Sequence, residues 1–215
     1  MSHPSDKPKD IYVLIPFFGI VIFVVLYILA TTFYPGGSQV DKDSVGFSWV
    51  NNYWCNLLSE TAENGQHNSA KPIAVTGMFV LCLAITFFWF LFPRHINIGK
   101  IGRLTIQISG ALAMAIGFLL FTNINHDLVI NLASTFGVIA TVGTFVGLYK
   151  SKWFALFTFG LLNLVLVGLN NYVYYTKGLI IYLPVIQKIS FATFLIWICC
   201  INLKLYFRTA IGNKV

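Results

Sequence analysis

Charged residues are scarce in this chain of 215 residues, since only 10% of its residues are Asp, Glu, Lys or Arg. Hydrophobic residues make up 57%, and the mean hydropathy is +0.78. A soluble globular domain carries about 25% charged residues, because its surface must be hydrated. The shortage of charge therefore excludes the soluble classes and predicts an integral membrane protein.

The cysteine and histidine patterns of a disulfide framework or a metal centre are also missing. Of the 4 cysteines, Cys82, Cys199 and Cys200 lie inside apolar runs, and only Cys55 lies in a polar stretch. The chain has no CxxC, HExxH or HxxxH spacing, so the ligands of a metal ion would have to come from separate segments. It also has no Asn-x-Ser/Thr sequon, which is compatible with a bacterial source.

Acidic residues are half as frequent as basic ones. The chain has 7 Asp and Glu against 14 Lys and Arg, which gives a net charge of +7 and a pI near 9.3. The basic residues stand singly or in small groups between apolar runs, as signals of membrane topology do. We therefore expect no nucleic-acid partner.

Six apolar runs are long enough to cross a bilayer, which takes about 20 helical residues. The runs lie at 11–33, 73–92, 104–121, 128–149, 153–175 and 183–206. The first run is too long for the core of a signal peptide, so we interpret it as a retained anchor. We predict an all-α fold, a polytopic bundle of six transmembrane helices that forms a single membrane domain over residues 1–215.

The basic residues that flank these runs are distributed unequally between the two sides of the membrane. Those on the side of the termini are Lys7, Lys9, Arg94, Lys100, Arg103, Lys150, Lys152, Lys204, Arg208 and Lys214. Those on the other side are Lys42, Lys71 and Lys177. Because cytoplasmic loops carry the excess of Lys and Arg, we expect both termini to be cytoplasmic and the protein to lie in the cytoplasmic (plasma) membrane.

The loop over residues 34–72 is the longest stretch that is not apolar, and this orientation places it outside the cell. Apolar residues between Phe47 and Leu58 recur at the i, i+3, i+4, i+7 spacing of one helical face. The opposite face carries Asn52, Asn56 and Glu60. We predict a short extracytoplasmic amphipathic helix here, with its aromatic side on the membrane or on neighbouring helices.

Polar side chains gather at the extracytoplasmic end of the predicted bundle, where burial in a membrane is costly unless they face a cavity. The candidate ligand-binding residues are Asn52, Asn56, His67, Asn123, Asn125, Asn163, Asn170, Asn171 and Lys188. We expect them to line an outward-facing polar pocket that binds a membrane lipid or a small amphiphile.

An alternative interpretation is an extracytoplasmic, membrane-embedded hydrolase or transferase. Its candidate catalytic residues are His126, Asp127 and Glu60, with His67 beside them. Imidazoles and carboxylates serve as acid–base groups and as zinc ligands. Simpler roles are open for the same residues, since His126 and Asp127 can cap the turn before the fourth span and Glu60 can pair with Lys71.

Two interpretations of Lys188 are open, and the start of the sixth helix decides between them. If the helix begins near Pro184, the ammonium group lies about one turn inside and can reach the membrane surface. If the helix begins near Leu179, the group lies deeper and needs a carboxylate or an anionic ligand.

Small residues recur at four-residue spacing in the third and fourth spans. The rows are Ser109, Ala113 and Gly117, then Ala133, Gly137 and Thr141. Small residues let helix backbones approach closely, so we expect these two spans to pack as a pair. A third functional interpretation is a helper subunit of a membrane complex or a homo-oligomer, which would need a helix face that the chain's own helices leave uncovered.

Three short motifs carry a resemblance to a known family. The runs YPGG, GFSWVNNYWCNLLSE and NGQHN resemble those of an uncharacterised family of six-helix bacterial membrane proteins, similar in layout to DRAM and Sfk-type proteins. The resemblance implies the six-helix fold and its orientation, and it implies no activity. The residues that match the family's polar outer signature are Asn52, Asn56, Asn64, Gly65 and Asn68.

The predicted layout is also similar to that of membrane hydrolases of the alkaline ceramidase type. Those enzymes use polar residues near one face of the membrane and carry a paired HxxxH in the final helix. This chain has no such pair, which argues against zinc-dependent amide hydrolysis.

Overall fold

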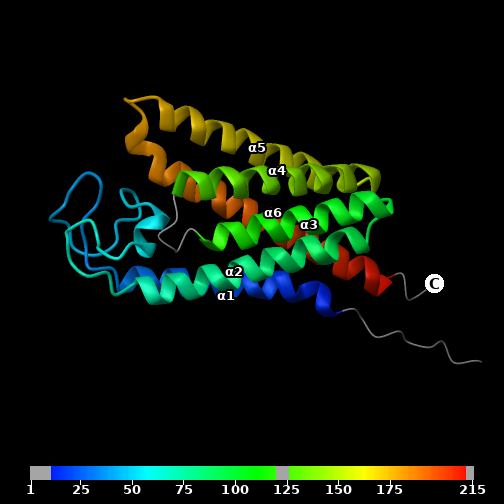
Figure 1. Cartoon of the computed structure of the whole chain (residues 1–215), viewed down its shortest axis with the longest axis horizontal. Coiled ribbons are helices and arrows are strands. Elements are labelled where there is room, and N and C mark those ends of the chain that lie inside the picture. The colour runs from blue at the N-terminus through cyan, green and yellow to red at the C-terminus, as the bar shows by residue number, and fades with distance from the viewer. Residues whose placement is uncertain (1–10, 120–125, 212–215) are drawn as a thin grey trace, which may run out of the picture.

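The computed structural model describes residues 11–119 and 126–211, through which six long helices run (Figure 1). They are α1 (Ile15–Thr32), α2 (Lys71–Leu91), α3 (Lys100–Phe118), α4 (His126–Lys150), α5 (Phe154–Tyr175) and α6 (Leu183–Ile211). Short 3-10 helices are η1 (Ile11–Leu14), η2 (Trp54–Leu58), η3 (Phe92–Arg94) and η5 (Ile180–Tyr182). Within the described ranges, β structure is limited to two isolated bridges, Gly36 with Val45 and Thr61 with His67.

All six helices are long and apolar enough to cross a membrane, as expected for an integral membrane protein. The predicted all-α fold with six transmembrane helices is therefore confirmed. One predicted start that differs is that of α3, which begins at Lys100, four residues before the predicted run, and includes Arg103 in its first turns. Long cationic side chains can extend from a helix end to the membrane surface, so they do not stop the helix.

The helices associate mainly as neighbours in sequence. The broadest interfaces join α1 with α2 and α3 with α4, while α2 also packs against α3 and α5 against α6. A Cβ atom at Gly110 would lie 2.6 Å from the Trp89 side chain, and a Cβ atom at Gly143 would collide with Ile106. The predicted close packing of the third and fourth spans is confirmed, because glycine permits this approach of α3 and α4.

The outward faces of the bundle are apolar, and α5 is the least covered of the six helices. Large side chains such as Leu161, Val165 and Leu169 are exposed along it. Hydrocarbon tails solvate such a surface as well as protein does, so exposed apolar faces are normal for helices in a bilayer.

The two ends of the bundle differ in charge. The cap end carries the compact cap, residues 34–70, in which all described carboxylate side chains lie. The opposite, basic end is where α1 begins and α6 ends (Figure 1). Its described basic residues are Arg94, His95, Lys100, Arg103, Lys150, Lys152, Lys204 and Arg208, and it holds no Asp or Glu among the residues that the structure describes.

The predicted amphipathic helix in the cap is wrong. The segment is a series of turns around the five-residue η2, and both Tyr53 and Ser59, which flank η2, have extended backbone angles. The Asn52 side chain accepts a hydrogen bond from the Ser48 N–H (2.8 Å), and that of Asn56 accepts one from the Tyr53 N–H (2.6 Å). Asparagine thus binds the backbone groups that a helix would have used.

Candidate functional site

Asn52 lies at the centre of the cap and is fully buried. Its Oδ1 accepts the hydrogen bond from Ser48, and its Nδ2 donates to the carbonyl oxygen of Gly37 at 2.8 Å. The amide therefore joins two turns that are 15 residues apart. Asn52, a predicted ligand-binding residue, uses both ends of its amide to hold the cap together.

Asn56 and Asn68 have similar roles inside the cap. Asn56 Nδ2 donates to Glu63 Oε1 at 2.8 Å. Asn68 Nδ2 lies within hydrogen-bonding distance of three carbonyl oxygens, those of Asn56 (3.1 Å), Leu57 (3.2 Å) and Ser59 (2.9 Å). Both side chains are buried, and their amides bond to backbone groups and to the Glu63 carboxylate within the cap.

Glu63 is the charged centre of the cap, a role that the sequence did not indicate. Its carboxylate accepts hydrogen bonds from Asn56 and Gln39 (3.2 Å) and forms an ion pair with Lys42. Its backbone N–H donates to the Tyr34 hydroxyl oxygen at 3.0 Å, and burial raises the pKa of Tyr34. These partners lie between 7 and 29 residues away, so no local pattern marks the role.

Glu60 and His67, both proposed for chemistry, are exposed at the surface of the cap. Glu60 forms an ion pair with Lys71, whose ammonium group lowers the pKa of the carboxyl group. Within the described ranges, no three His, Cys, Asp or Glu side chains lie close enough together to hold a metal ion. The ion pair with Lys71, which the sequence left open as a simple role for Glu60, is thus present.

The structure describes only part of the other residues that were predicted for a site at the cap end. Asn123 and Asn125 lie outside the described residues. His126 and Asp127 open α4, and their side chains lie outside the described part of the structure. The acid–base cluster of His126, Asp127 and Glu60 stays a prediction.

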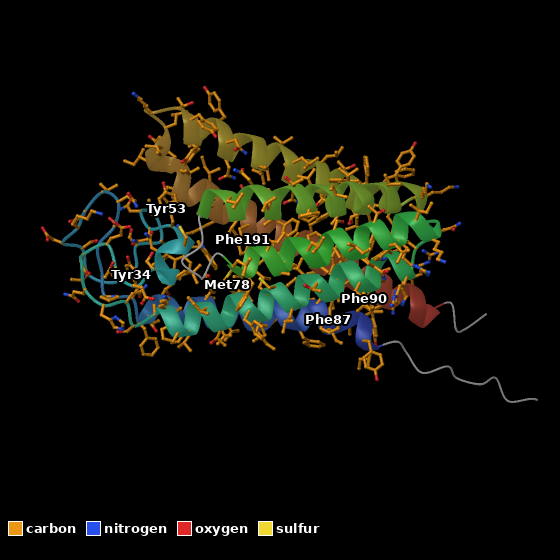
Figure 2. All side chains as sticks on the ribbon, viewed as in Figure 1. Tyr34, Tyr53, Met78, Phe87, Phe90 and Phe191 are labelled. Carbon is orange, nitrogen blue, oxygen red and sulfur yellow. The ribbon has the colours of Figure 1, made fainter. Side chains whose placement is uncertain are left out.

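Aromatic side chains attach the cap to the bundle. The Trp54 ring stacks on Tyr27 of α1 with 4.8 Å between the ring centroids. It also lies 6.0 Å from Phe23 and 5.9 Å from Phe191 of α6. Figure 2 shows Phe191 close to the cap, which contains Tyr34 and Tyr53. The aromatic side of the cap therefore faces neighbouring helices, as the sequence predicted.

Lys188 attaches the cap to α6. Its Nζ donates to the carbonyl oxygens of Asn52 and Pro184, the latter at 3.0 Å, and lies 5.8 Å from the centre of the Phe47 ring. The two ion pairs found among the described residues, Lys42–Glu63 and Lys71–Glu60, do not include it. Since α6 begins at Leu183, the half-buried ammonium group lies about one turn inside and binds backbone carbonyls of the cap.

The asparagines of α5 lie apart from the cap hydrogen bonds. Asn170 Nδ2 donates to Leu166 O (2.9 Å) and to the Ser190 hydroxyl of α6, while Asn171 is exposed. Asn163 is buried and donates to Phe159 O at 3.1 Å. The side-chain oxygens of Asn163 and Asn170 are buried without a hydrogen-bond partner within the structure's described ranges.

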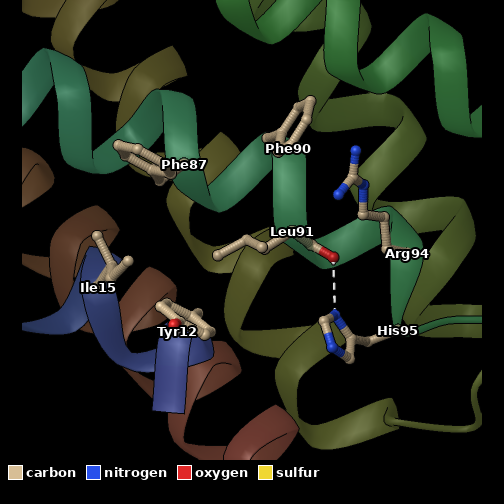
Figure 3. A pocket seen from close by; sticks show the side chains of 7 residues that line it. All are labelled: Tyr12, Ile15, Phe87, Phe90, Leu91, Arg94 and His95. Atoms are coloured by element: carbon tan, nitrogen blue, oxygen red, sulfur yellow. Dashed lines mark hydrogen bonds between the residues drawn. The ribbon is translucent and has the colours of Figure 1, made fainter. Parts of the chain in front are cut away.

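An open groove of about 480 Å³ lies at the basic end, between the start of α1 and the end of α2 (Figure 3). We call it the α1–α2 groove. Its lining residues are Tyr12, Ile15, Phe87, Phe90, Leu91, Arg94 and His95. The residues from η1 and α1 face those from α2 across the groove, and Figure 2 shows Phe87 and Phe90 far from the cap.

Two polar residues of this groove, Arg94 and His95, come from the segment that follows α2, across the groove from Tyr12. The Arg94 guanidinium carbon lies 3.8 Å from the centre of the Phe90 ring, which is the distance of a cation–π contact. His95 Nδ1 lies 2.9 Å from the Leu91 carbonyl oxygen. The groove is thus apolar over most of its lining and cationic at one edge.

The structure therefore separates two regions that carry polar side chains. The cap uses its amides internally, and the α1–α2 groove combines an apolar wall with a cation. The resemblance to DRAM and Sfk-type proteins stays a prediction. We found no match to this chain among protein-family models, curated proteins or solved structures.

Proposed function

We propose that this membrane protein binds a lipid or another small amphiphile in the α1–α2 groove. The observation that supports the proposal is the polarity of the groove, which matches that of an amphiphile. Ile15, Phe87 and Leu91 offer apolar surface, and Arg94 lies at the edge where a headgroup would lie. Ligand sites are typically apolar with a few convergent polar groups.

The apolar wall and the cation contribute differently to such binding. A lipid tail in a bilayer is already surrounded by hydrocarbon, so contact with the wall gains little hydrophobic free energy and selects mainly for shape. Arg94 offers a planar set of N–H donors suited to phosphate or carboxylate oxygens. The preference for one lipid over another should therefore come from the headgroup.

We propose further that the basic end faces the cytoplasm and the cap the other side, in the cytoplasmic membrane. The support is the excess of Lys and Arg at the basic end. The proposed binding site then lies on the side opposite to the pocket that the sequence predicted. The cap asparagines favour this change, because Asn52, Asn56 and Asn68 have partners within the protein.

A photocrosslinking experiment that compares the parent protein with a variant whose groove is narrowed tests this proposal. Purified protein would be incubated with a phospholipid that carries a photoreactive diazirine in its acyl chain, and crosslinked peptides would be mapped by mass spectrometry. We expect crosslinks within residues 12–15 and 87–95. Ile15→Trp should reduce them, because the larger side chain occupies part of the groove.

A matched variant separates groove binding from general lipid contact. Ile22 lies two turns further along α1 and is exposed, but it does not line the groove. Ile22→Trp should leave the crosslinks at 87–95 unchanged. Equal crosslinking in the parent protein and in Ile15→Trp would contradict the proposal.

A further inference from the structure

A second groove lies at the basic end, between the α4–α5 turn and the last turns of α6. Its volume is about 230 Å³. Lys152, Trp153, Phe154 and Leu156 line it from the turn and from the start of α5, and Lys204 lines it from α6. None of these residues lines the α1–α2 groove, so binding in the second groove is independent of the function proposed for the first.

Lys152 is held in this groove by an unusual backbone conformation. Its φ of 57° makes it the single non-glycine residue with positive φ in the described part of the chain. The turn is closed by hydrogen bonds from the Lys152 N–H to Tyr149 O and from the Trp153 N–H to Leu148 O, both 3.0 Å. Glycine is the usual residue at such a helix end, because it adopts this conformation without strain. Lys152 adopts this strained conformation and lines the groove with a cationic side chain.

The second cation of the groove, Lys204, comes from a different helix. Arg208, one turn further along α6, has its guanidinium carbon 5.8 Å from the centre of the Trp153 ring. No Asp or Glu stands near these three cations in the described part of this end. Like charges that share a groove repel each other unless an anion lies between them.

The apolar lining of the second groove indicates that an anion bound there would come from the membrane. Trp153 lies at the start of α5, where tryptophan is common at the surface of a bilayer. Phe154 is 54% exposed on the outward face of α5, so the groove opens toward the lipid. A phosphate that reached the groove from the membrane would carry acyl chains that could lie along this face.

We propose that this second groove binds the phosphate group of an anionic membrane lipid, with Lys152 and Lys204 as its cationic partners. Basic residues at a cytoplasmic face attract anionic lipids in general. A general attraction depends only on net charge and treats every lysine of this end alike. A built site depends on the two lysines that share the groove.

Native mass spectrometry of the purified full chain can distinguish these two cases. The protein would be titrated with phosphatidylglycerol and with phosphatidylcholine of the same acyl chains. We expect the parent protein to retain phosphatidylglycerol in preference to phosphatidylcholine. Lys152→Gly and Lys204→Gln should each lower the affinity of the protein for phosphatidylglycerol by about fivefold, and the double variant should lower it further. Lys152→Gly removes the charge and relieves the backbone strain, so we expect it to fold at least as stably as the parent protein.

Lys100→Gln is the matched control. It removes one positive charge from the same end, at the start of α3, and lines neither groove. We expect no change in phosphatidylglycerol affinity. An equal loss in Lys100→Gln and Lys204→Gln would overturn the proposal in favour of general attraction, as would equal retention of the two lipids by the parent protein.

A competition arm identifies the source of the phosphate. Glycerol 1-phosphate should not displace the bound phosphatidylglycerol at millimolar concentration, because it lacks the acyl chains that would contact Phe154 and the outward face of α5. Displacement that Lys204→Gln abolishes would overturn the assignment to a lipid and indicate a soluble phosphate ligand.

Discussion

The cap and the basic end both bring polar side chains to a surface of the membrane, but they use these side chains in opposite ways. In the cap, Asn52, Asn56 and Glu63 have partners within the protein. At the basic end, Arg94 and Lys204 line grooves in a region whose described residues include no carboxylate. The high density of polar residues in the cap therefore serves its folding, whereas the cations beside the two apolar grooves are the feature on which the proposed ligand sites rest.

The largest effect that would sharpen this comparison is expected at Asn52. Asn52→Leu leaves the buried Gly37 carbonyl and the Ser48 N–H without their side-chain partner. Each unsatisfied group costs about 1 to 3 kcal/mol, so we expect cap opening to become easier by about 2 to 4 kcal/mol. Hydrogen exchange of the backbone amides in residues 34–70 measures this free energy.

Asn171→Leu is the control for that measurement. It makes the same substitution at an exposed residue of α5. We expect the exchange rates of the cap to stay as they are in the parent protein. If the cap amides exchanged at the same rate in Asn52→Leu and Asn171→Leu, Asn52 would not be a structural residue. A ligand-binding role for Asn52 would then be open again.

The second effect is expected at Lys188, where α6 holds the cap. Lys188→Met keeps the apolar stem but removes the hydrogen bonds to Asn52 O and Pro184 O. Hydrogen bonds from a charged donor contribute about 1.5 to 3 kcal/mol, part of which water can replace here. We expect faster hydrogen exchange in residues 47–53 by roughly tenfold. Lys177→Met, in the exposed α5–α6 turn, should leave that exchange unchanged.

The third effect, at Lys152, is stabilising. Lys152→Gly should raise the stability by about 0.5 to 1 kcal/mol, because glycine relieves the left-handed backbone at this position. Lys150→Gly removes the same charge from the last turn of α4 and should destabilise by a similar amount. Thermal unfolding of the three proteins in one detergent measures both changes. A loss of stability in Lys152→Gly would show that the lysine is required by the fold and not retained for a ligand.

The smallest effect concerns the ion pair on the surface of the cap. Lys71 lowers the pKa of Glu60 in the folded protein, so the pair stabilises the cap above the ordinary glutamate pKa of 4.5. The stabilisation is lost as the pH falls below 4.5 and through the lowered pKa. Near neutral pH, the backbone amides of the cap should therefore exchange hydrogen slightly faster in Glu60→Gln than in the parent protein. The difference should vanish at a pH low enough to protonate the Glu60 carboxyl group of the parent protein. An equal difference under both conditions would contradict the role of the ion pair.

The membrane frame could be predicted from the sequence because it depends on local composition. A run of about 20 apolar residues has one stable conformation in hydrocarbon, a helix that satisfies its own backbone. The small residues of the third and fourth spans likewise indicated the close approach of α3 and α4. Helix ends shifted by a few residues, as at α3, where Lys100 and Arg103 extend the helix at the membrane surface, and at α6, which runs to Ile211.

The cap and the grooves could not be predicted, because contacts between distant residues form them. The spacing between Phe47 and Leu58 fits a helix, but Trp54 is fixed by Tyr27 and Phe191, which lie on two other helices. The groove at Arg94 lies between residues of η1 and α1 on one side and residues from the end of α2 on the other, and periodicity within one segment carries no information on such a neighbour. The sequence identified the outer asparagines as unusual but not their partners.

Lipid bound to the purified intact protein, measured for one charge-neutralising variant at each end, tests most directly whether ligand binding belongs to the basic end. We predict that Arg94→Gln loses the part of the retained phospholipid that the α1–α2 groove holds, while its cap stays protected from hydrogen exchange. Lys188→Gln should keep its phospholipid while its cap exchanges faster. The reverse result, with lipid lost in Lys188→Gln and retained in Arg94→Gln, would contradict this assignment and place the ligand site beneath the cap.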